Sequence, residues 1–361
     1  MAYRYHNPVA IVGGPGSIET LPALLAGRRA VLVTFPEAES LGLVARLRVL
    51  LGDLLVGVED RIAPNPDVSE LAPMYERFWR APNCEAVIAV GGGSAIDTAK
   101  ALMVGTASGR FDELLQLLSR GGSFVPYAVK SLIAVPTTAG TGSEVTPWAT
   151  IWDKAAGRKY SLHLPQTWPE AAVIDADLML TLPASVTLQS GLDALSHALE
   201  AIWNRNANPV SDHHAVVAAR EVMATLPLLM KDLSSRPLRV RMAQAALLAG
   251  LAFSNTKTAL AHSISYEMTL RFGLPHGIAC SFTLPMVLRR AIGHDAGRDA
   301  VLQQVFGDLD AAPQMLARFI ESLGVATEFD AYGVDADDAQ RMVRDALDGV
   351  RGKNFIGLAQ A

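Results

Sequence analysis

Short apolar runs rich in β-branched residues alternate with stretches of helical character through the first half of the chain. These runs occupy residues 30–35, 54–58, 86–90, 132–135 and 172–174. Continuous apolar runs of about 4 to 6 residues that end at glycine or proline are typical of strands buried on both faces of a sheet. Residues 1–183 are therefore predicted to form an α/β domain with a mainly parallel sheet, the class in which nucleotides are commonly bound.

The pattern changes after Leu182 and Pro183. Apolar residues now recur at spacings of three and four, as in the segment RVRMAQAALLAGLAF, and this spacing is typical of helices with one face in a core. Strand-like runs nearly disappear. Residues 184–361 are therefore predicted to form a second, all-helical domain.

The composition excludes several classes of function. The chain has 361 residues, half of them hydrophobic, with 31 Lys and Arg against 36 Asp and Glu. This acidic balance without a basic run argues against nucleic acid as a partner. No apolar run approaches the roughly 20 residues that cross a bilayer, and the start of the chain lacks the apolar stretch of a signal peptide. We expect a cytoplasmic protein with no membrane association.

Two glycine-rich turns follow apolar strands. The first, GGGSAIDTAK from Gly91, leads from a strand into a helix, so its backbone can approach a diphosphate while the helix start supplies N–H donors. Its spacing is not that of the usual GxGxxG motif. The second, PTTAGTGSE from Pro136, offers three threonine hydroxyls to a polar ligand. Together they favour a dinucleotide site at one edge of the sheet over two simple turns.

One carboxylate and three imidazoles in the second half are candidates for a metal site. Asp193 and His197 are four residues apart in GLDALSHALEA, so on a helix they share one face. His262 and His276 follow later in the chain. Such a set suits a divalent first-row ion. The other histidines receive no role, and Cys84 and Cys280 are interpreted as small core residues rather than ligands.

These motifs together resemble one family, the iron-containing (group III) alcohol dehydrogenases, along nearly the whole chain. The resemblance rests on GGGSAIDTAK, PTTAGTGSEVT, GLDALSHALEA and the later AH and PHG pair, and the segment from Ala261 to Pro285 is similar to the phosphonoacetaldehyde reductase branch. It implies the fold shared with dehydroquinate synthase: an N-terminal dinucleotide-binding α/β domain and an all-α C-terminal domain. It also implies hydride transfer between an alcohol and NAD or NADP at a catalytic metal.

The resemblance assigns roles to particular residues. The metal ligands would be Asp193, His197, His262 and His276, with Fe(II) the family default and Zn(II) common in relatives. The cofactor would be bound by a longer set, namely Asn65, Gly92, Gly93, Ser94, Asp97, Thr137, Thr138, Thr141 and Lys159.

Two positions depart from the family pattern. Many members have an acidic residue just after the second strand, which hydrogen-bonds the adenosine ribose and selects NAD; here Phe35 occupies that place, so the choice between NAD and NADP stays open. Many members also have a histidine four residues after the third ligand, and here the residue is Tyr266. A phenol can relay a proton, but its reference pKa of about 10 makes it a poor base at neutral pH, and shaping the pocket is the alternative role.

The substrate is expected to be a small alcohol or aldehyde. An anionic aldehyde such as phosphonoacetaldehyde would need cations near the site, and Lys257 and Arg271 flank the third ligand, with Arg351 and Lys353 nearer the C-terminus. Each of these residues could equally be a surface charge. A generic short-chain primary alcohol dehydrogenase is the main alternative.

Two further classes of function remain as alternatives. A lyase of the dehydroquinate synthase type would recycle its NAD, and a catalytically silent nucleotide-binding protein would be expected to have lost part of the ligand set. Because the sequence follows the alcohol dehydrogenase form of each motif, a dehydrogenase is favoured over both. The first segment can form an exposed edge strand, which favours self-association, and the resemblance implies a homodimer or a higher homo-oligomer.

Overall fold

The computed structural model describes residues 2–81, 83–120 and 125–357. Its chain forms two compact units. The α/β unit contains residues from Pro8 to Thr138 and from Ser143 to Leu178. The helical unit contains the segment up to Asn7, the loop Ala139–Gly142 and the chain from Met179 onward. The predicted boundary at residue 183 lies close to this last change, whereas nothing in the sequence indicated that a loop of the first half joins the helical unit.

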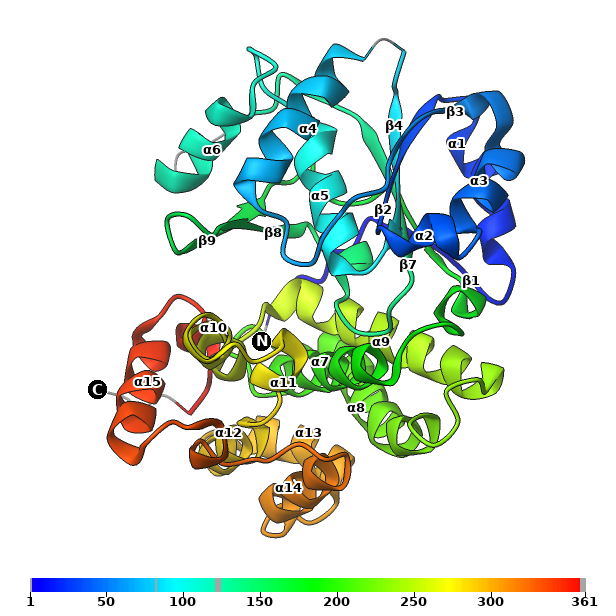
Figure 1. Cartoon of the computed structure of the whole chain (residues 1–361). Helices are drawn as coiled ribbons and strands as arrows, with labels where there is room; N and C mark the ends of the chain where they lie inside the picture. The colour runs from blue at the N-terminus through cyan, green and yellow to red at the C-terminus, as the bar shows by residue number, and fades with distance from the viewer. Residues whose placement is uncertain (1, 82, 121–124, 358–361) are drawn as a thin grey trace. The chain divides into compact units, whose positions relative to one another are not determined.

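A six-stranded, fully parallel sheet forms the centre of the α/β unit (Figure 1). The five apolar runs predicted from the sequence all form strands in it, which confirms the α/β fold class. The strands are buried on both faces in the middle of the sheet because helices cover both sides. In spatial order they are β1 (Ala10–Gly13), β10 (Ala171–Ile174), β7 (Ser131–Pro136), β4 (Ala86–Gly91), β2 (Ala30–Thr34) and β3 (Leu55–Glu59).

The two faces of the sheet belong to two separate cores. In β4, Ile88 and Val90 pack into one core while Val87 and Ala89 pack into the other, as the period of two requires. The first core is completed by α1 (Leu21–Leu25) and α3 (Leu43–Leu51). The second is completed by α4 (Val68–Arg80), α5 (Gly93–Met103) and α6 (Phe111–Arg120). A short helix, α2 (Glu37–Ser40), follows β2.

Two antiparallel strand pairs of the α/β unit escaped the sequence analysis. They are β8 (Trp148–Asp153) with β9 (Arg158–His163), and the short β5 (Val104–Gly105) with β6 (Ala128–Val129). In β9 only Leu162 is buried. A strand with one covered face carries no continuous apolar run, so the rule used for the central sheet does not detect it.

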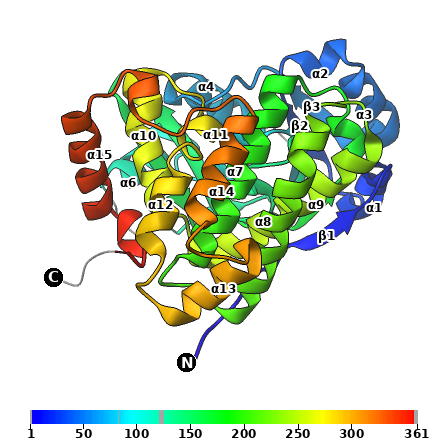
Figure 2. The same ribbon diagram turned by 90° about the horizontal axis from the view of Figure 1, so that it is seen from below.

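The helical unit confirms the predicted all-α second half: from residue 184 to residue 357 the chain contains no β-strand (Figure 2). Three long helices pack side by side, namely α7 (Ala184–Ile202), α8 (Pro209–Leu229) and α9 (Arg236–Thr256). The helix α8 begins with a capping box between Asn208 and Ser211. None of the described helices is long and apolar enough to span a membrane.

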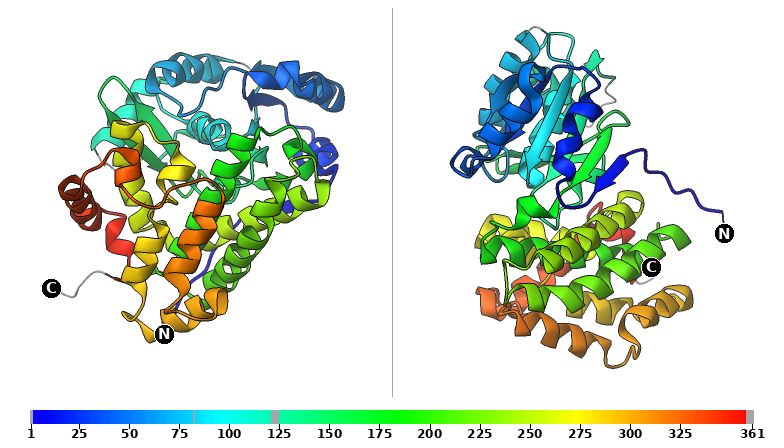
Figure 3. Two further views of the ribbon diagram at one scale, coloured as in Figure 1. Left: turned by 60° about the horizontal axis from the view of Figure 1, so that its bottom comes forward. Right: turned by 90° about the vertical axis from the view of Figure 1, so that its right-hand side faces the viewer.

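The rest of the helical unit consists of shorter helices (Figure 3). They are α10 (Leu260–Phe272), α11 (His276–Ala279), α12 (Leu284–Ala291), α13 (Ala296–Phe306), α14 (Ala312–Ser322) and α15 (Ala336–Asp348). Short 3₁₀ turns occur along the whole chain and not in the helical unit alone. They occupy Ser17–Thr20, Gly52–Leu54, Ser143–Val145, Ala176–Met179, Asp330–Tyr332 and Gly352–Asn354. The helices α10 and α11 matter most here because each carries a predicted metal ligand.

Candidate metal centre

The helical unit brings the four predicted ligands together around one carboxylate. Asp193 and His197 lie one turn apart on α7, His262 lies on α10, and His276 is the first residue of α11. The Asp193 Oδ1 atom lies 3.4 Å from Nε2 of His262, 3.7 Å from Nε2 of His197 and 3.9 Å from Nε2 of His276. The side chain of His276 is 42% exposed, whereas the other three are buried.

Two of the imidazoles are held at Nδ1, so that Nε2 faces the carboxylate. The Nδ1 of His197 lies 3.2 Å from the carbonyl oxygen of Gly140, and its ring stacks on Phe253 with centroids 4.0 Å apart. The Nδ1 of His262 lies 2.7 Å from Oε2 of Glu200. In the neutral ring, a proton on Nδ1 leaves Nε2 with the lone pair that a metal-ligating histidine requires.

The Nε2 atom of His262 is the clearest sign that this cluster can hold a metal ion. It is buried, and within the described part of the chain it has no hydrogen-bond partner. Buried polar atoms of this kind call for an ion or a water. Bonds of about 2.0 to 2.2 Å to one ion place its ligands about 3.0 to 3.5 Å apart, slightly less than the spacing around Asp193, so small movements suffice. The donor set therefore fits a divalent first-row ion such as iron or zinc.

Glu200 supports this site and was missed by the sequence analysis. It lies two turns after Asp193 on α7 and is fully buried. Besides His262, its carboxylate accepts hydrogen bonds from the backbone N–H groups of Ala259 at 2.8 Å and Ala261 at 2.6 Å. The spacing of seven residues from Asp193 put it on the same helical face, and that was the signal available in the sequence.

Cys280 is fully buried, as expected of a small core residue, but it also lies in the cluster. Its Sγ is 3.4 Å from Oδ1 of Asp193, and a thiol, a carboxylate and the imidazoles of His262 and His276 offer ligand atoms within 4.8 Å of one another. Burial raises the pKa of the Cys280 thiol well above its usual value, and the Asp193 charge raises it further. The thiol therefore keeps its proton and donates a hydrogen bond to Asp193.

The site keeps its carboxylate charged and one imidazole neutral. Burial alone would raise the pKa of Asp193, but the neighbouring imidazoles outweigh it and hold that pKa well below its usual range. Burial lowers the pKa of His197 to about 4. For His262, the charges of Glu200 and Asp193 outweigh burial and raise the pKa. A charged oxygen ligand beside neutral imidazole is the state that binds a metal ion.

In the α/β unit, the predicted phosphate turn lies at the carboxyl end of β4. No side chain caps α5, whose first residue is Gly93. A Cβ placed on Gly92 would lie 3.4 Å from Cγ2 of Thr138, and the buried hydroxyl of Thr138 has no partner among the described residues. Because Gly91 pairs with Pro136 across β4 and β7, the two glycine-rich segments begin at the same edge of the sheet.

Other predicted cofactor residues have structural contacts of their own. The Ser94 hydroxyl accepts a hydrogen bond from the Asn65 backbone N–H at 3.1 Å. The Thr137 backbone N–H donates to the carbonyl of Gly91 at 3.0 Å. Lys159 lies in β9, with its ammonium 5.2 Å from the ring of Trp152, and Thr141 belongs to the loop that joins the helical unit.

Asp97 holds the loop that returns to the α/β unit. Its two carboxylate oxygens accept hydrogen bonds from the Ser143 hydroxyl at 2.6 Å and from the Thr150 N–H at 2.8 Å. The buried ammonium of Lys100 donates to the carbonyls of Ser143 and Trp148. Burial lowers the pKa of Lys100 to about 8. These contacts give Asp97 a local positioning role that the sequence did not indicate.

The predicted proton relay and the predicted substrate cations lie in different surroundings. Tyr266 is on α10, one turn after His262, and burial raises its pKa although the charge of Arg351 opposes the shift. Arg271 is exposed and forms ion pairs with Glu267 and with Asp338. Lys257 is exposed at the end of α9.

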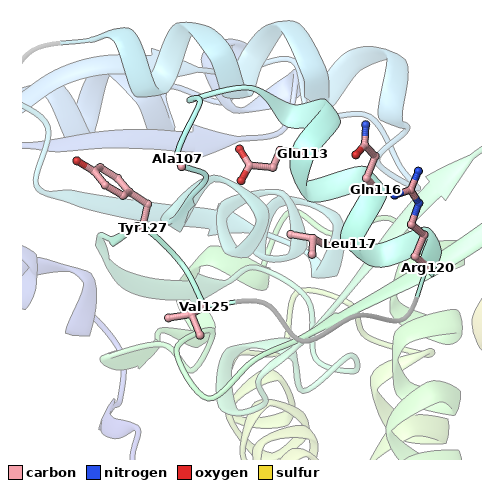
Figure 4. Close-up of a pocket in the computed structure, with 7 residues that line it drawn as sticks. All are labelled: Ala107, Glu113, Gln116, Leu117, Arg120, Val125 and Tyr127. Atoms are coloured by element: carbon pink, nitrogen blue, oxygen red, sulfur yellow. The ribbon is translucent and has the colours of Figure 1, made fainter.

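A surface pocket lies beside α6 in the α/β unit (Figure 4). None of the predicted site residues lines it, so it plays no part in the following argument. Its lining consists of Ala107, Glu113, Gln116, Leu117, Arg120, Val125 and Tyr127.

Known families and proteins match the chain over both units. The family model for iron-containing alcohol dehydrogenase matches residues 8–176, and the model for the C-terminal part of the Fe-containing alcohol dehydrogenase family matches residues 187–361. The NAD-dependent methanol dehydrogenase of Bacillus methanolicus is 30% identical over 363 residues, which cover 96% of this chain and 94% of that protein.

Two relatives named for anionic aldehydes are similar as well. The phosphonoacetaldehyde reductase of Streptomyces viridochromogenes is 34% identical over 288 residues, covering 75% of this chain and 72% of that protein. The crystal structure of sulfoacetaldehyde reductase from Bifidobacterium kashiwanohense in complex with NAD⁺ superposes with a TM-score of 0.90 at 28% identity, covering 98% of this chain and 94% of that one. The chain belongs to the iron-containing alcohol dehydrogenase family.

Proposed function

We propose that this protein transfers a hydride between NAD(P)(H) and a small alcohol or aldehyde, with a metal ion held by Asp193, His197, His262 and His276. The observation that carries the proposal is the arrangement around Asp193, in which three Nε2 atoms lie within 3.4 to 3.9 Å of one carboxylate oxygen. Membership in a family of alcohol dehydrogenases supplies the reaction class.

The surrounding residues would prepare this centre for an iron or zinc ion. When bound, such an ion supplies Lewis-acid polarisation of the substrate oxygen. Glu200 and the Gly140 carbonyl keep the protons of His262 and His197 on Nδ1, so both rings present Nε2. Tyr266 stays protonated at neutral pH because its pKa is raised. It is therefore suited to donate a hydrogen bond or to shape the pocket rather than to act as a base.

The cofactor would be bound at the carboxyl edge of the parallel sheet. The uncapped start of α5 offers backbone N–H donors to a diphosphate, and the buried Thr138 hydroxyl beside Gly92 has no protein partner among the described residues. The related sulfoacetaldehyde reductase was crystallised with NAD⁺. Since Phe35 replaces the acidic residue that favours NAD in many relatives, we propose that NADPH is also accepted.

An aldehyde with an anionic group is the substrate class that we favour, with a short-chain uncharged aldehyde as the competitor. The relatives named for phosphonoacetaldehyde and sulfoacetaldehyde support the first, and the relative named for methanol supports the second. We further propose that the protein acts in the cytoplasm as a homodimer or a larger homo-oligomer. Its two buried cysteines, both free thiols, are compatible with a reducing compartment.

Purified protein, loaded with Fe(II) or with Zn(II), tests the reaction class. Steady-state consumption of NADH and NADPH is followed with phosphonoacetaldehyde and with butyraldehyde. The proposal expects net oxidation of the cofactor in proportion to alcohol formed. A lyase that recycles its NAD, or a silent nucleotide-binding protein, would show no net turnover, and that result would refute the proposed function.

A further inference from the structure

Unlike Arg271, which pairs with Glu267 and Asp338, Arg351 has no carboxylate partner among the described residues. It is half-buried at the start of the 3₁₀ turn Gly352–Asn354. Its Nη1 donates a hydrogen bond to Oγ1 of Thr258 at 3.0 Å, and its guanidinium carbon lies 4.9 Å from the centroid of the Tyr266 ring. Among residues 2–81, 83–120 and 125–357 it takes part in no ion pair. A guanidinium carries five N–H donors, and among the described residues only Thr258 accepts a hydrogen bond from Arg351.

The backbone that carries Arg351 is fixed by close contacts. A Cβ on Gly352 would lie 2.0 Å from the carbonyl oxygen of Ala346, so only glycine fits at this position. The side chain of Asn354 donates to the carbonyl of Thr258 at 2.9 Å, and Phe355 is fully buried. With its backbone fixed in this way and its side chain held by Thr258 and Tyr266, Arg351 loses little further freedom when it binds a ligand.

Tyr266 connects Arg351 with the metal centre. Tyr266 follows His262 by one turn on α10, so both side chains project from the same face of that helix. The phenol interacts electrostatically with Arg351 and also with Cys280 and Glu200, which lie beside the predicted ligands. The Tyr266 ring thus contacts the Arg351 guanidinium and is close to the metal centre.

We propose that Arg351 binds the anionic group of the substrate and thereby sets the preference for a phosphonate- or sulfonate-bearing aldehyde. This inference rests on the proposed function, since it assumes that an aldehyde is reduced at the metal centre. The planar guanidinium can form two parallel hydrogen bonds with oxygens of a phosphonate or sulfonate. Its contact with the Tyr266 ring and its hydrogen bond to Thr258, which uses one of its donors, hold the guanidinium in place. Arg271, which pairs with two carboxylates, is not assigned this role.

The wild-type protein gives the first test. We measure kcat/KM for phosphonoacetaldehyde and for butyraldehyde, and define their quotient as the selectivity ratio. The inference expects a ratio above one. If butyraldehyde has the higher kcat/KM, the inference is overturned while the proposed function stands. If neither aldehyde is reduced with NADH or NADPH, the proposed function fails, and the inference fails with it.

Substitution of Arg351 gives the second test. Arg351→Met keeps an unbranched stem against Tyr266 but removes the charge, and it should lower the selectivity ratio by about 10- to 100-fold, mainly through KM for phosphonoacetaldehyde. Arg344→Gln is the control, because Arg344 is an exposed arginine of the same unit; it should leave the ratio within about twofold, as expected for a screened surface charge. An equal loss of kcat/KM for both aldehydes in Arg351→Met would indicate a structural role and contradict the assignment.

Discussion

Replacement of Glu200 by glutamine should weaken metal binding although Glu200 is not a predicted ligand. Its carboxylate accepts four hydrogen bonds, from Nδ1 of His262 and from the backbone N–H groups of Ala259, Ala261 and His262. Glutamine offers one accepting oxygen, and its amide nitrogen only donates. If that nitrogen faces His262, the imidazole must shift its proton to Nε2, the atom that is expected to bind the metal.

The size of the effect follows from these contacts. Each oxygen of the Glu200 carboxylate accepts two hydrogen bonds, so replacing one oxygen by an amide nitrogen removes two of them. A hydrogen bond to a charged group contributes about 1.5 to 3 kcal/mol, so this loss should lower the free energy of unfolding of the metal-free protein by about 3 to 6 kcal/mol. Loss of a carboxylate that orients a ligating histidine typically costs about 10- to 100-fold in metal affinity. Both changes act through one buried residue of α7.

Two measurements on Glu200→Gln separate these effects. Urea unfolding of the metal-free form measures stability, and competition with a chelator measures the affinity for Zn(II). Glu221→Gln is the matched control: Glu221 is a partly exposed residue of α8 that pairs with Arg241, and its loss should change stability by about 1 kcal/mol or less. A zinc affinity of Glu200→Gln within twofold of wild type would refute the role assigned to Glu200.

Three further predictions concern single residues. His276→Ala should lose bound iron or zinc together with activity, and because the ring is 42% exposed the fold should survive; wild-type metal content by elemental analysis would count against His276 as a ligand. Phe35→Asp should shift the ratio of kcat/KM for NADH over NADPH upward by at least about tenfold, since an acid there hydrogen-bonds a ribose hydroxyl and repels a 2′-phosphate; an unchanged ratio would contradict this account of cofactor choice. Burial raises the pKa of Glu144 from 4.5 to about 7, so its contribution to stability is present below pH 4.5 and is lost as the pH rises through 7. Glu144→Gln should therefore stabilise the protein more at pH 8 than at pH 5, by about 2 to 3 kcal/mol, and a pH-independent difference in urea unfolding would be the contrary result.

The strands of the central sheet could be predicted from the sequence because a strand buried on both faces is a continuous run of apolar residues. Each run of the 86–90 type had to be apolar throughout, since helices cover both sides of the sheet. The hairpin of β8 and β9 could not be predicted in this way, because only one residue of β9 is buried and the strand therefore has no continuous apolar run. The loop Ala139–Gly142 looked like part of a cofactor turn, and only its three-dimensional contacts group it with the helical unit.

The candidate site was predictable to the extent that residue type reveals chemistry. Three histidines and an aspartate in a helical region pointed to one cluster, and the structure brings these side chains together. Glu200 was not predicted because the sequence does not distinguish a buried glutamate from the exposed glutamates that are common in helices. The contrast between Arg351 and Arg271 depended on long-range ion pairs, which join residues 67 positions apart in the case of Arg271 and Asp338.

The most direct test of the central claim is activity measured as a function of bound metal. Protein freed of metal with a chelator is titrated with Fe(II) under anaerobic conditions, and aldehyde reduction by NADH or NADPH is recorded at each step. The account predicts that activity is absent without metal and rises in proportion to bound iron until one ion is bound per chain. Full activity in the metal-free protein would contradict it.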